Sequence, residues 1–292
     1  MSYTGWILLT ASLVGLTCGL VGTLLILRRM AMMADAISHT VLLGIVIAFL
    51  ATRSLHGIHM LVGAALAGLL TAFLVQWLHA RGVREDASMG VVFTTLFAIG
   101  VILIATQVGN AHLDVEHALM GEIIFIPFNV TQLPVVGEVP LATLTLLIVT
   151  ILVIALILLF YKEWKITSFD PALAASLGIP VGLMHYLFMT MVSVTAVASF
   201  DAVGAIMVVA MLITPAAAAY LWTDQLRIMF VLSGLFGVLA AFIGYYTAVW
   251  LDTSVSGSMA FATGLIFLVS ILLSPKYGLL GKRLRPAQGE VK

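Results

Sequence analysis

Residues 28–51 read RRMAMMADAISHTVLLGIVIAFLA. The basic pair ends a first apolar run, and the residues after His39 are nearly all apolar, so Asp35 and His39 belong to a second membrane-spanning helix. Residues four apart lie on one face of a helix. Ionisable groups are costly inside a membrane unless they face a cavity, a partner or an ion, and a carboxylate with an imidazole suits divalent transition metals. We interpret Asp35 and His39 as a metal site on a path through the bilayer.

The composition also indicates a polytopic membrane protein. Hydrophobic residues make up 62% of the 292 residues and charged residues 9%, whereas soluble domains contain roughly 25% charged residues. Basic and acidic residues number 13 each, and they form no basic cluster suited to nucleic acid. The single cysteine, Cys18, excludes an internal disulfide and a cysteine-based metal cluster. The first apolar run is best interpreted as a retained span, because no basic segment precedes it.

A hydrocarbon core of about 30 Å needs about 20 apolar residues per helix. Nine segments fit this length, and they cover residues 6–27, 35–52, 58–79, 88–107, 140–161, 181–199, 202–221, 228–250 and 256–274. Only Phe200 and Asp201 separate the sixth from the seventh, so eight spans are an alternative. The fold class expected is all-α, with one transmembrane domain over residues 1–284 and a cytoplasmic tail over 285–292.

The Lys and Arg residues predict the orientation, because basic residues concentrate on the cytoplasmic side. With the N-terminus outside, twelve of the 13 fall inside, and only Arg53 falls outside. The C-terminus is then cytoplasmic. The long outer loop over 108–139 contains no Lys or Arg but carries a weaker candidate group for binding metal at the outer mouth: His112, Asp114, Glu116 and His117. An ordinary polar loop is the alternative.

The inner segment over 162–180 is predicted to contain a short amphipathic helix over about 170–178. Asp170 suits the N-cap and Pro171 the first helical position, while Gly178 suits a left-handed C-terminal residue. Ala174 and Leu177 lie within it. The helix is either a connector lying on the membrane or a docking helix for a cytoplasmic motor. The chain itself has no phosphate-binding loop, because its nearest match, over 278–283, has the wrong spacing.

Four segments in order carry a family resemblance. Residues 28–44 resemble the signature of the metal-importer permeases of bacterial ABC transporters, the manganese, zinc and iron group. Residues 170–180 resemble the coupling helix of that family, 203–217 its seventh-span motif, and 274–280 its C-terminal end. Within the family, the chain is most similar to manganese-type permeases.

The resemblance implies a multi-pass subunit of the bacterial cell (inner) membrane that contacts membrane lipid and works in a pair with a second copy or a related permease. It implies separate cytoplasmic ATP-binding subunits and an extracytoplasmic metal-binding protein. It also implies that Asp35 and His39 hold the metal in transit. No cofactor is expected to stay bound: Mn²⁺, or Zn²⁺ or Fe²⁺, is cargo, and ATP binds the partner subunit. The chain itself is therefore expected not to be an enzyme.

Two ligands are too few for tight binding, but two copies meeting at an axis would supply two carboxylates and two imidazoles. That set suits Mn²⁺, Fe²⁺ or Zn²⁺ better than Ca²⁺ or Mg²⁺. A metalloenzyme is disfavoured, because a His-Glu-x-x-His pattern is missing. An ion-coupled secondary transporter is the alternative from another class, although no inverted repeat is evident.

Overall fold

The computed structural model describes residues 2–52, 57–107, 123–133, 137–275 and 278. Within these residues nine apolar helices match the nine predicted spans in order, and eight of them are long and apolar enough to cross a membrane. The ninth, α10, has a shorter apolar stretch over Met207–Trp222. The nine are α1 (Tyr3–Leu27), α2 (Ala31–Thr52), α3 (Gly57–Ala80), α4 (Glu85–Gln107), α6 (Leu141–Leu159), α9 (Val181–Val203), α10 (Ala205–Trp222), α11 (Leu226–Leu251) and α12 (Val255–Leu273). The all-α polytopic fold is confirmed, and the counts of eight and nine differ only in α10.

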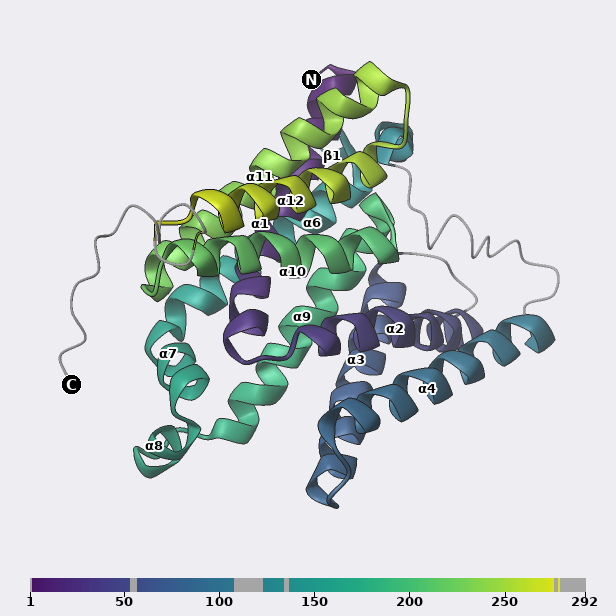
Figure 1. Cartoon of the computed structure of the whole chain (residues 1–292). Helices are drawn as coiled ribbons and strands as arrows, with labels where there is room; N and C mark the ends of the chain where they lie inside the picture. Colours follow the sequence, from purple (N-terminus) through teal and green to yellow (C-terminus); the bar gives the residue numbers. More distant parts are fainter. Residues whose placement is uncertain (1, 53–56, 108–122, 134–136, 276–277, 279–292) are drawn as a thin grey trace.

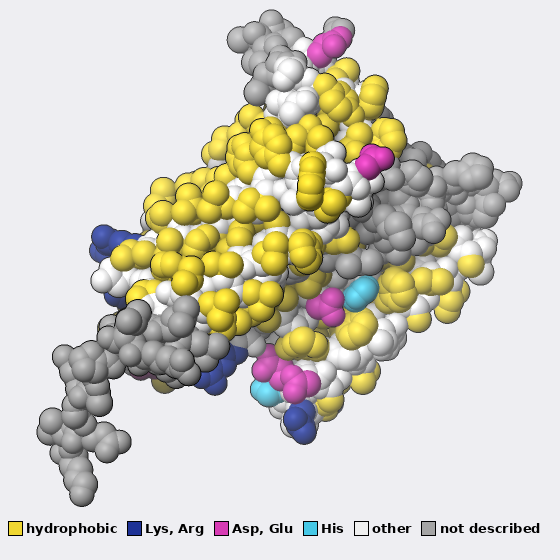
Figure 2. Space-filling model, turned by 45° about the horizontal axis from the view of Figure 1, so that its top comes forward, with side chains coloured by type: hydrophobic (Ala, Val, Ile, Leu, Met, Phe, Trp, Pro, Cys, Tyr) yellow, Lys and Arg dark blue, Asp and Glu magenta, His cyan; other side chains and the backbone are white. Residues whose placement is uncertain are grey.

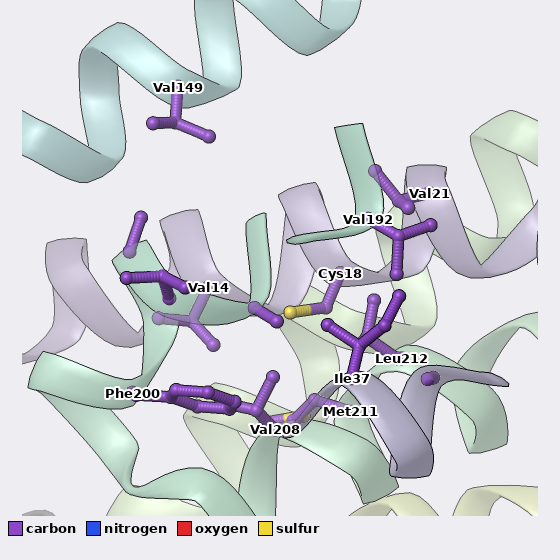
Figure 3. Packing of buried hydrophobic residues seen from close by; sticks show 14 of the residues in the cluster. Val14, Cys18, Val21, Ile37, Val149, Val192, Phe200, Val208, Met211 and Leu212 are labelled. Atoms are coloured by element: carbon purple, nitrogen blue, oxygen red, sulfur yellow. The ribbon is translucent and has the colours of Figure 1, made fainter. Parts of the chain in front are cut away.

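Helix α1 lies at the centre of one group of helices, where it packs against α6, α9, α10 and α11 (Figure 1). Its buried side chains meet those of α2, α9 and α10 in the apolar core (Figure 3). Two hydroxyl pairs join it to α6: the Oγ1 atoms of Thr10 and Thr143 are 2.6 Å apart, and those of Thr17 and Thr150 are also 2.6 Å apart. Each pair advances by seven residues on both helices, so α1 and α6 run parallel, as the predicted first and fifth spans must.

Small residues let the helices of this core approach closely. A Cβ atom added at Gly15 would overlap the backbone carbonyl of Gly237 on α11, and one added at Gly63 would overlap the carbonyl of Gly44 on α2. Close backbone approach at small residues is a common basis of helix association in lipid, where apolar burial gives little drive. These glycines on the first and third spans therefore serve helix packing.

A second group consists of α2, α3 and α4, and Figure 1 shows it on the other side of α9 and α10 from most of the first group. A hydroxyl bond of 2.8 Å joins Thr71 on α3 to Thr40 on α2. Helix α9 contacts both groups, and its Ser193 hydroxyl donates to the Ala64 carbonyl at 3.0 Å. Because α2 carries the predicted metal pair, α9 connects the helix of the site to the central core.

The boundary between the sixth and seventh spans differs from the prediction. Helix α9 continues through Asp201 to Val203, and the chain turns at Gly204, whose φ is 82°. Glycine adopts positive φ with little steric cost. The polar residue at 201 was the wrong signal for the break, and the glycine three residues later supplies it.

The expected outer loop over 108–139 is partly structured where it is described. A 3₁₀ helix, η1, covers Ile123–Phe128. Strands β1 (Val130–Leu133) and β2 (Gly137–Pro140) then pair antiparallel, with Val130 opposite Pro140. η1 packs against α1, and the hairpin leads directly into α6. The sequence prediction missed these elements because each is too short to show an apolar periodicity.

Candidate metal centre and its connection to the inner surface

The predicted pair lies on one face of α2, within its first two and a half turns. His39 Nε2 is 3.6 Å from Asp35 Oδ1, and the two side chains are 37% and 42% exposed, respectively. Asp35 is the fifth residue of the helix, so it does not act as its N-cap. At about 1.5 Å of rise per residue, Asp35 lies roughly 6 Å and His39 roughly 12 Å along the axis from the start of α2. Both side chains reach the surface of this chain.

Aromatic rings of α4 position the imidazole. The ring of Phe93 stacks on that of His39 with centroids 5.5 Å apart, and Phe97 approaches with its ring at a steep angle at 5.8 Å. Among the described contacts, the His39 ring has no hydrogen bond to a backbone carbonyl. Helix α4 comes this close because Gly100 lies against the backbone of Leu43 on α2. The imidazole is thus held by rings while its Nε2 faces the carboxylate.

The ligand set within one chain is incomplete. In the described part of the chain, three or more His, Cys, Asp or Glu side chains do not gather anywhere in a way that could hold a metal ion. Metal centres with N and O ligands generally use four or more donors. Asp35 and His39 can supply two of them, and their partial exposure leaves the pair open to further donors.

Few charged groups compete with this pair at the surface. Figure 2 shows a mostly hydrophobic face with small, separate groups of acidic, basic and histidine side chains. An exposed ion pair of 3.8 Å joins Arg84 and Asp86 at the turn between α3 and α4. The Asp35–His39 contact, in contrast, pairs a carboxylate with an imidazole inside a span.

The predicted short inner helix is present as α8 (Pro171–Ser176). Asp170 Oδ1 accepts from the Leu173 backbone N–H at 2.9 Å, and Pro171 takes the first helical position. After the helix, Gly178 has a φ of 80°, and the Ile179 N–H donates to the Ala174 carbonyl at 3.0 Å. The N-cap, proline and glycine thus act as the sequence predicts.

The exposure of α8 leaves an apolar surface facing outward. Ala174 is fully buried against the chain, whereas Leu173 and Leu177 are 49% and 61% exposed. Phe169, just before the helix, is 59% exposed. These three apolar side chains remain uncovered by the chain itself.

Sequence reasoning missed a second inner helix and the residue that holds it. Helix α7 (Tyr161–Phe169) connects α6 to α8. Arg28, at the end of α1, donates from Nε to Ser168 Oγ at 3.1 Å and from a terminal guanidinium nitrogen to Thr167 Oγ1 at 2.8 Å. Its guanidinium also lies over the rings of Trp164 and Phe188, at 5.4 and 4.9 Å. Burial lowers the pKa of Arg28 to about 10, so the group is cationic at neutral pH.

Residues 1–274 match the ABC 3 transport family over nearly the whole described chain. The chain belongs to this family. It is 58% identical to the manganese transport system membrane protein MntD of Bacillus subtilis over 285 residues, covering 98% of this chain and 97% of MntD. It is 40% identical to the zinc transport system membrane protein TroD of Treponema pallidum, covering 95% and 76%. The solved structure of PsaBC from Streptococcus pneumoniae in complex with Fab superposes with a TM-score of 0.82 at 32% identity, covering 97% and 96%.

For this member of the ABC 3 transport family, the predicted residues divide into two sets. Asp35, His39 and the α8 residues lie where the sequence placed them, on one helix face and on one short helix. The outer-mouth candidates lie outside the described residues: His112, Asp114, Glu116 and His117. The missed residues were Phe93, Phe97 and Arg28, of which only Arg28 had a signal, as a basic residue at a span end.

Proposed function

We propose that this chain is the membrane-spanning permease subunit of an ATP-driven importer for a divalent transition metal, with manganese as the main cargo. The observation that supports it most directly is the Asp35–His39 pair on the exposed face of α2. The similarity to MntD over almost the whole chain supports manganese, since MntD is a manganese transport protein. The 40% identity to TroD, a zinc transport protein, makes zinc the alternative cargo.

The incomplete ligand set favours a pair of permeases. A second copy facing α2 would add a carboxylate and an imidazole, which together make a four-ligand set for Mn²⁺, Fe²⁺ or Zn²⁺. A site shared between two subunits can also be opened by moving them apart. Transport requires such weak or changeable holding, because the ion must leave as well as enter.

The inner surface supplies a place for the ATP-binding subunits. Helix α8 presents the uncovered side chain of Leu173, and Phe169 and Leu177 lie uncovered just before and after it. These apolar side chains suit an apolar groove on a cytoplasmic partner. ATP hydrolysis is assigned to that partner, because the sequence lacks a phosphate-binding loop. We assign residues 1–284 to one permease domain in the inner membrane and 285–292 to a cytoplasmic tail. A metal-binding protein delivers cargo from outside.

The test is metal uptake by cells that lack their own importer and express the chain with its partner subunits. Asp35→Asn and His39→Gln each remove a ligand with little change in shape, so we expect uptake of radioactive Mn²⁺ to fall roughly tenfold or more. Asp86→Asn and His79→Gln make the same chemical changes at exposed inner positions and should leave uptake unchanged. Membrane levels of every variant are measured alongside.

Competition identifies the cargo. Excess unlabelled Mn²⁺ should suppress the labelled uptake at lower concentration than Zn²⁺ or Fe²⁺. Normal uptake by Asp35→Asn or His39→Gln at normal membrane levels would overturn the metal site. Uptake that persists without the ATP-binding subunits would instead favour an ion-coupled transporter.

A further inference from the structure

A groove outside the metal centre opens between α6 and α11. Both helices pack against α1 and make little contact with each other, and Leu20 of α1 lies between them. The groove has a volume of about 700 Å³, which is within the range of roughly 300–1,000 Å³ found for small-molecule sites. Its walls are mainly apolar, including Leu158 of α6 and Val231 of α11, which are 71% and 70% exposed.

Basic residues line one end of this groove. Lys162 follows the end of α6, and Arg227 lies at the start of α11, so both belong to the predicted inner membrane boundary. The Arg227 guanidinium lies 5.3 Å from the centroid of the Tyr161 ring, which holds this cation at the rim. Neither Lys162 nor Arg227 makes an ion pair within the described residues. Glu163 is the acidic residue of the lining, so the rim has a formal charge of one positive.

We propose that this groove binds one anionic phospholipid of the inner leaflet. The phosphate would lie between Lys162 and Arg227, and an acyl chain would lie along α6 and α11. Basic pockets at the cytoplasmic ends of membrane helices bind acidic lipid headgroups, and each basic residue near the surface adds to the attraction. Inorganic phosphate has no apolar group to pack against the walls of the groove. A lipid without net charge would leave the positive charge of the rim unneutralised.

The lipid would add to the contact between α7 and α11 that Tyr161 and Arg227 already make. Its headgroup would touch α7 through Lys162 and α11 through Arg227, while α7 leads directly into α8. Occupancy would therefore brace the inner end of α7 against the core. This role is independent of which metal is carried, so it stands or falls separately from the proposed function.

Native mass spectrometry of the full chain tests the proposal, with added phosphatidylglycerol or phosphatidylcholine of matched acyl chains. We expect one phosphatidylglycerol to remain bound in preference to phosphatidylcholine. Lys162→Gln with Arg227→Gln should weaken phosphatidylglycerol binding by roughly thirtyfold, from two lost cations. Leu158→Trp with Val231→Trp fills the groove while keeping both cations, and it should weaken both lipids.

The control is Arg81→Gln with Lys165→Gln, which removes the same charge from other positions of the inner surface. Arg81 also lies over an aromatic ring, that of Trp77 at 4.3 Å, so it matches Arg227 in its setting. The control should bind phosphatidylglycerol as the unaltered chain does. Equal retention of both lipids by the unaltered chain, or equal loss in the control, would overturn the proposal. So would displacement of the lipid by millimolar inorganic phosphate. Size-exclusion profiles verify that each variant is folded.

Discussion

Replacing Arg28 should loosen the junction between α1 and the inner helices more than replacing any neighbouring basic residue. In Arg28→Ala the chain loses both hydrogen bonds to α7, to Thr167 and Ser168, and both ring contacts. Arg28→Lys keeps the charge, but an ammonium group cannot make the same forked bonds or stack on two rings. We expect the alanine variant to be the less stable of the two, and both to be less stable than the unaltered chain.

The magnitude follows from the contacts. Hydrogen bonds to a charged group contribute about 1.5–3 kcal/mol each, and a partly buried cation–ring contact adds about 0.5–2 kcal/mol. Burial lowers the pKa of Arg28 to about 10, which shows that enclosing the charge is costly, so the low end applies. Thr167 Oγ1 also keeps its bond of 2.7 Å to the Glu163 carbonyl without Arg28. Two hydrogen bonds and two ring contacts at the low end give a loss of about 4 kcal/mol in the free energy of unfolding for Arg28→Ala.

Denaturant titration of the detergent-solubilised chain measures this loss. Arg29→Gln is the matched control, because Arg29 is exposed and adjoins Arg28. It should change the free energy of unfolding by less than about 0.5 kcal/mol, as exposed substitutions usually do. An Arg28→Ala variant as stable as the control would show that the junction contacts do not contribute, and the reasoning would fail.

Three further changes test other parts of the structure. Gly15→Ala places a Cβ against the Gly237 carbonyl and should destabilise the chain by about 1–3 kcal/mol in the same titration, whereas Gly264→Ala on α12 meets open space and should be neutral or slightly stabilising. Asp170→Ala removes the N-cap of α8, which should weaken this helix by about 1 kcal/mol and slow metal uptake in cells. Asp170→Asn keeps a capping oxygen, so its uptake should match that of the unaltered chain. Phe93→Ala frees the His39 ring and should lower uptake at limiting Mn²⁺ by roughly tenfold, while Phe261→Ala, a 65% exposed aromatic on α12, should not.

The sequence predicted the features that depend on local spacing. Apolar length located the spans, and the interval of four residues placed Asp35 and His39 on one face, because helical geometry alone decides both. The cap at Asp170 and the left-handed Gly178 were also predictable, since each acts within a few residues. The turn at Gly204 was missed because a polar residue three positions earlier gave a competing signal.

Contacts between distant segments could not be read in the same way. Phe93 and Phe97 are two aromatic residues among many in an apolar span, and only the packing of α4 on α2 brings them to His39. Arg28 was used as a sign of orientation, because basic residues at span ends are common on the inner side. Its bonds to α7 depend on how α1 and α6 align, which the threonine pairs between those helices help to fix.

The position of Arg28 also bears on how the inner surface and the metal pair could communicate. Arg28 is bonded to α7, the segment that leads into α8, and Asp35 follows it by seven residues along the chain. Most of those seven residues are already in α2, so few freely rotating bonds separate the two points. A force applied at α8 therefore has a short, mostly helical route to the first turns of α2. Under the proposed function, Arg28→Lys should reduce uptake further than its loss of stability explains, whereas a purely structural role would make uptake fall only in proportion to the folded fraction.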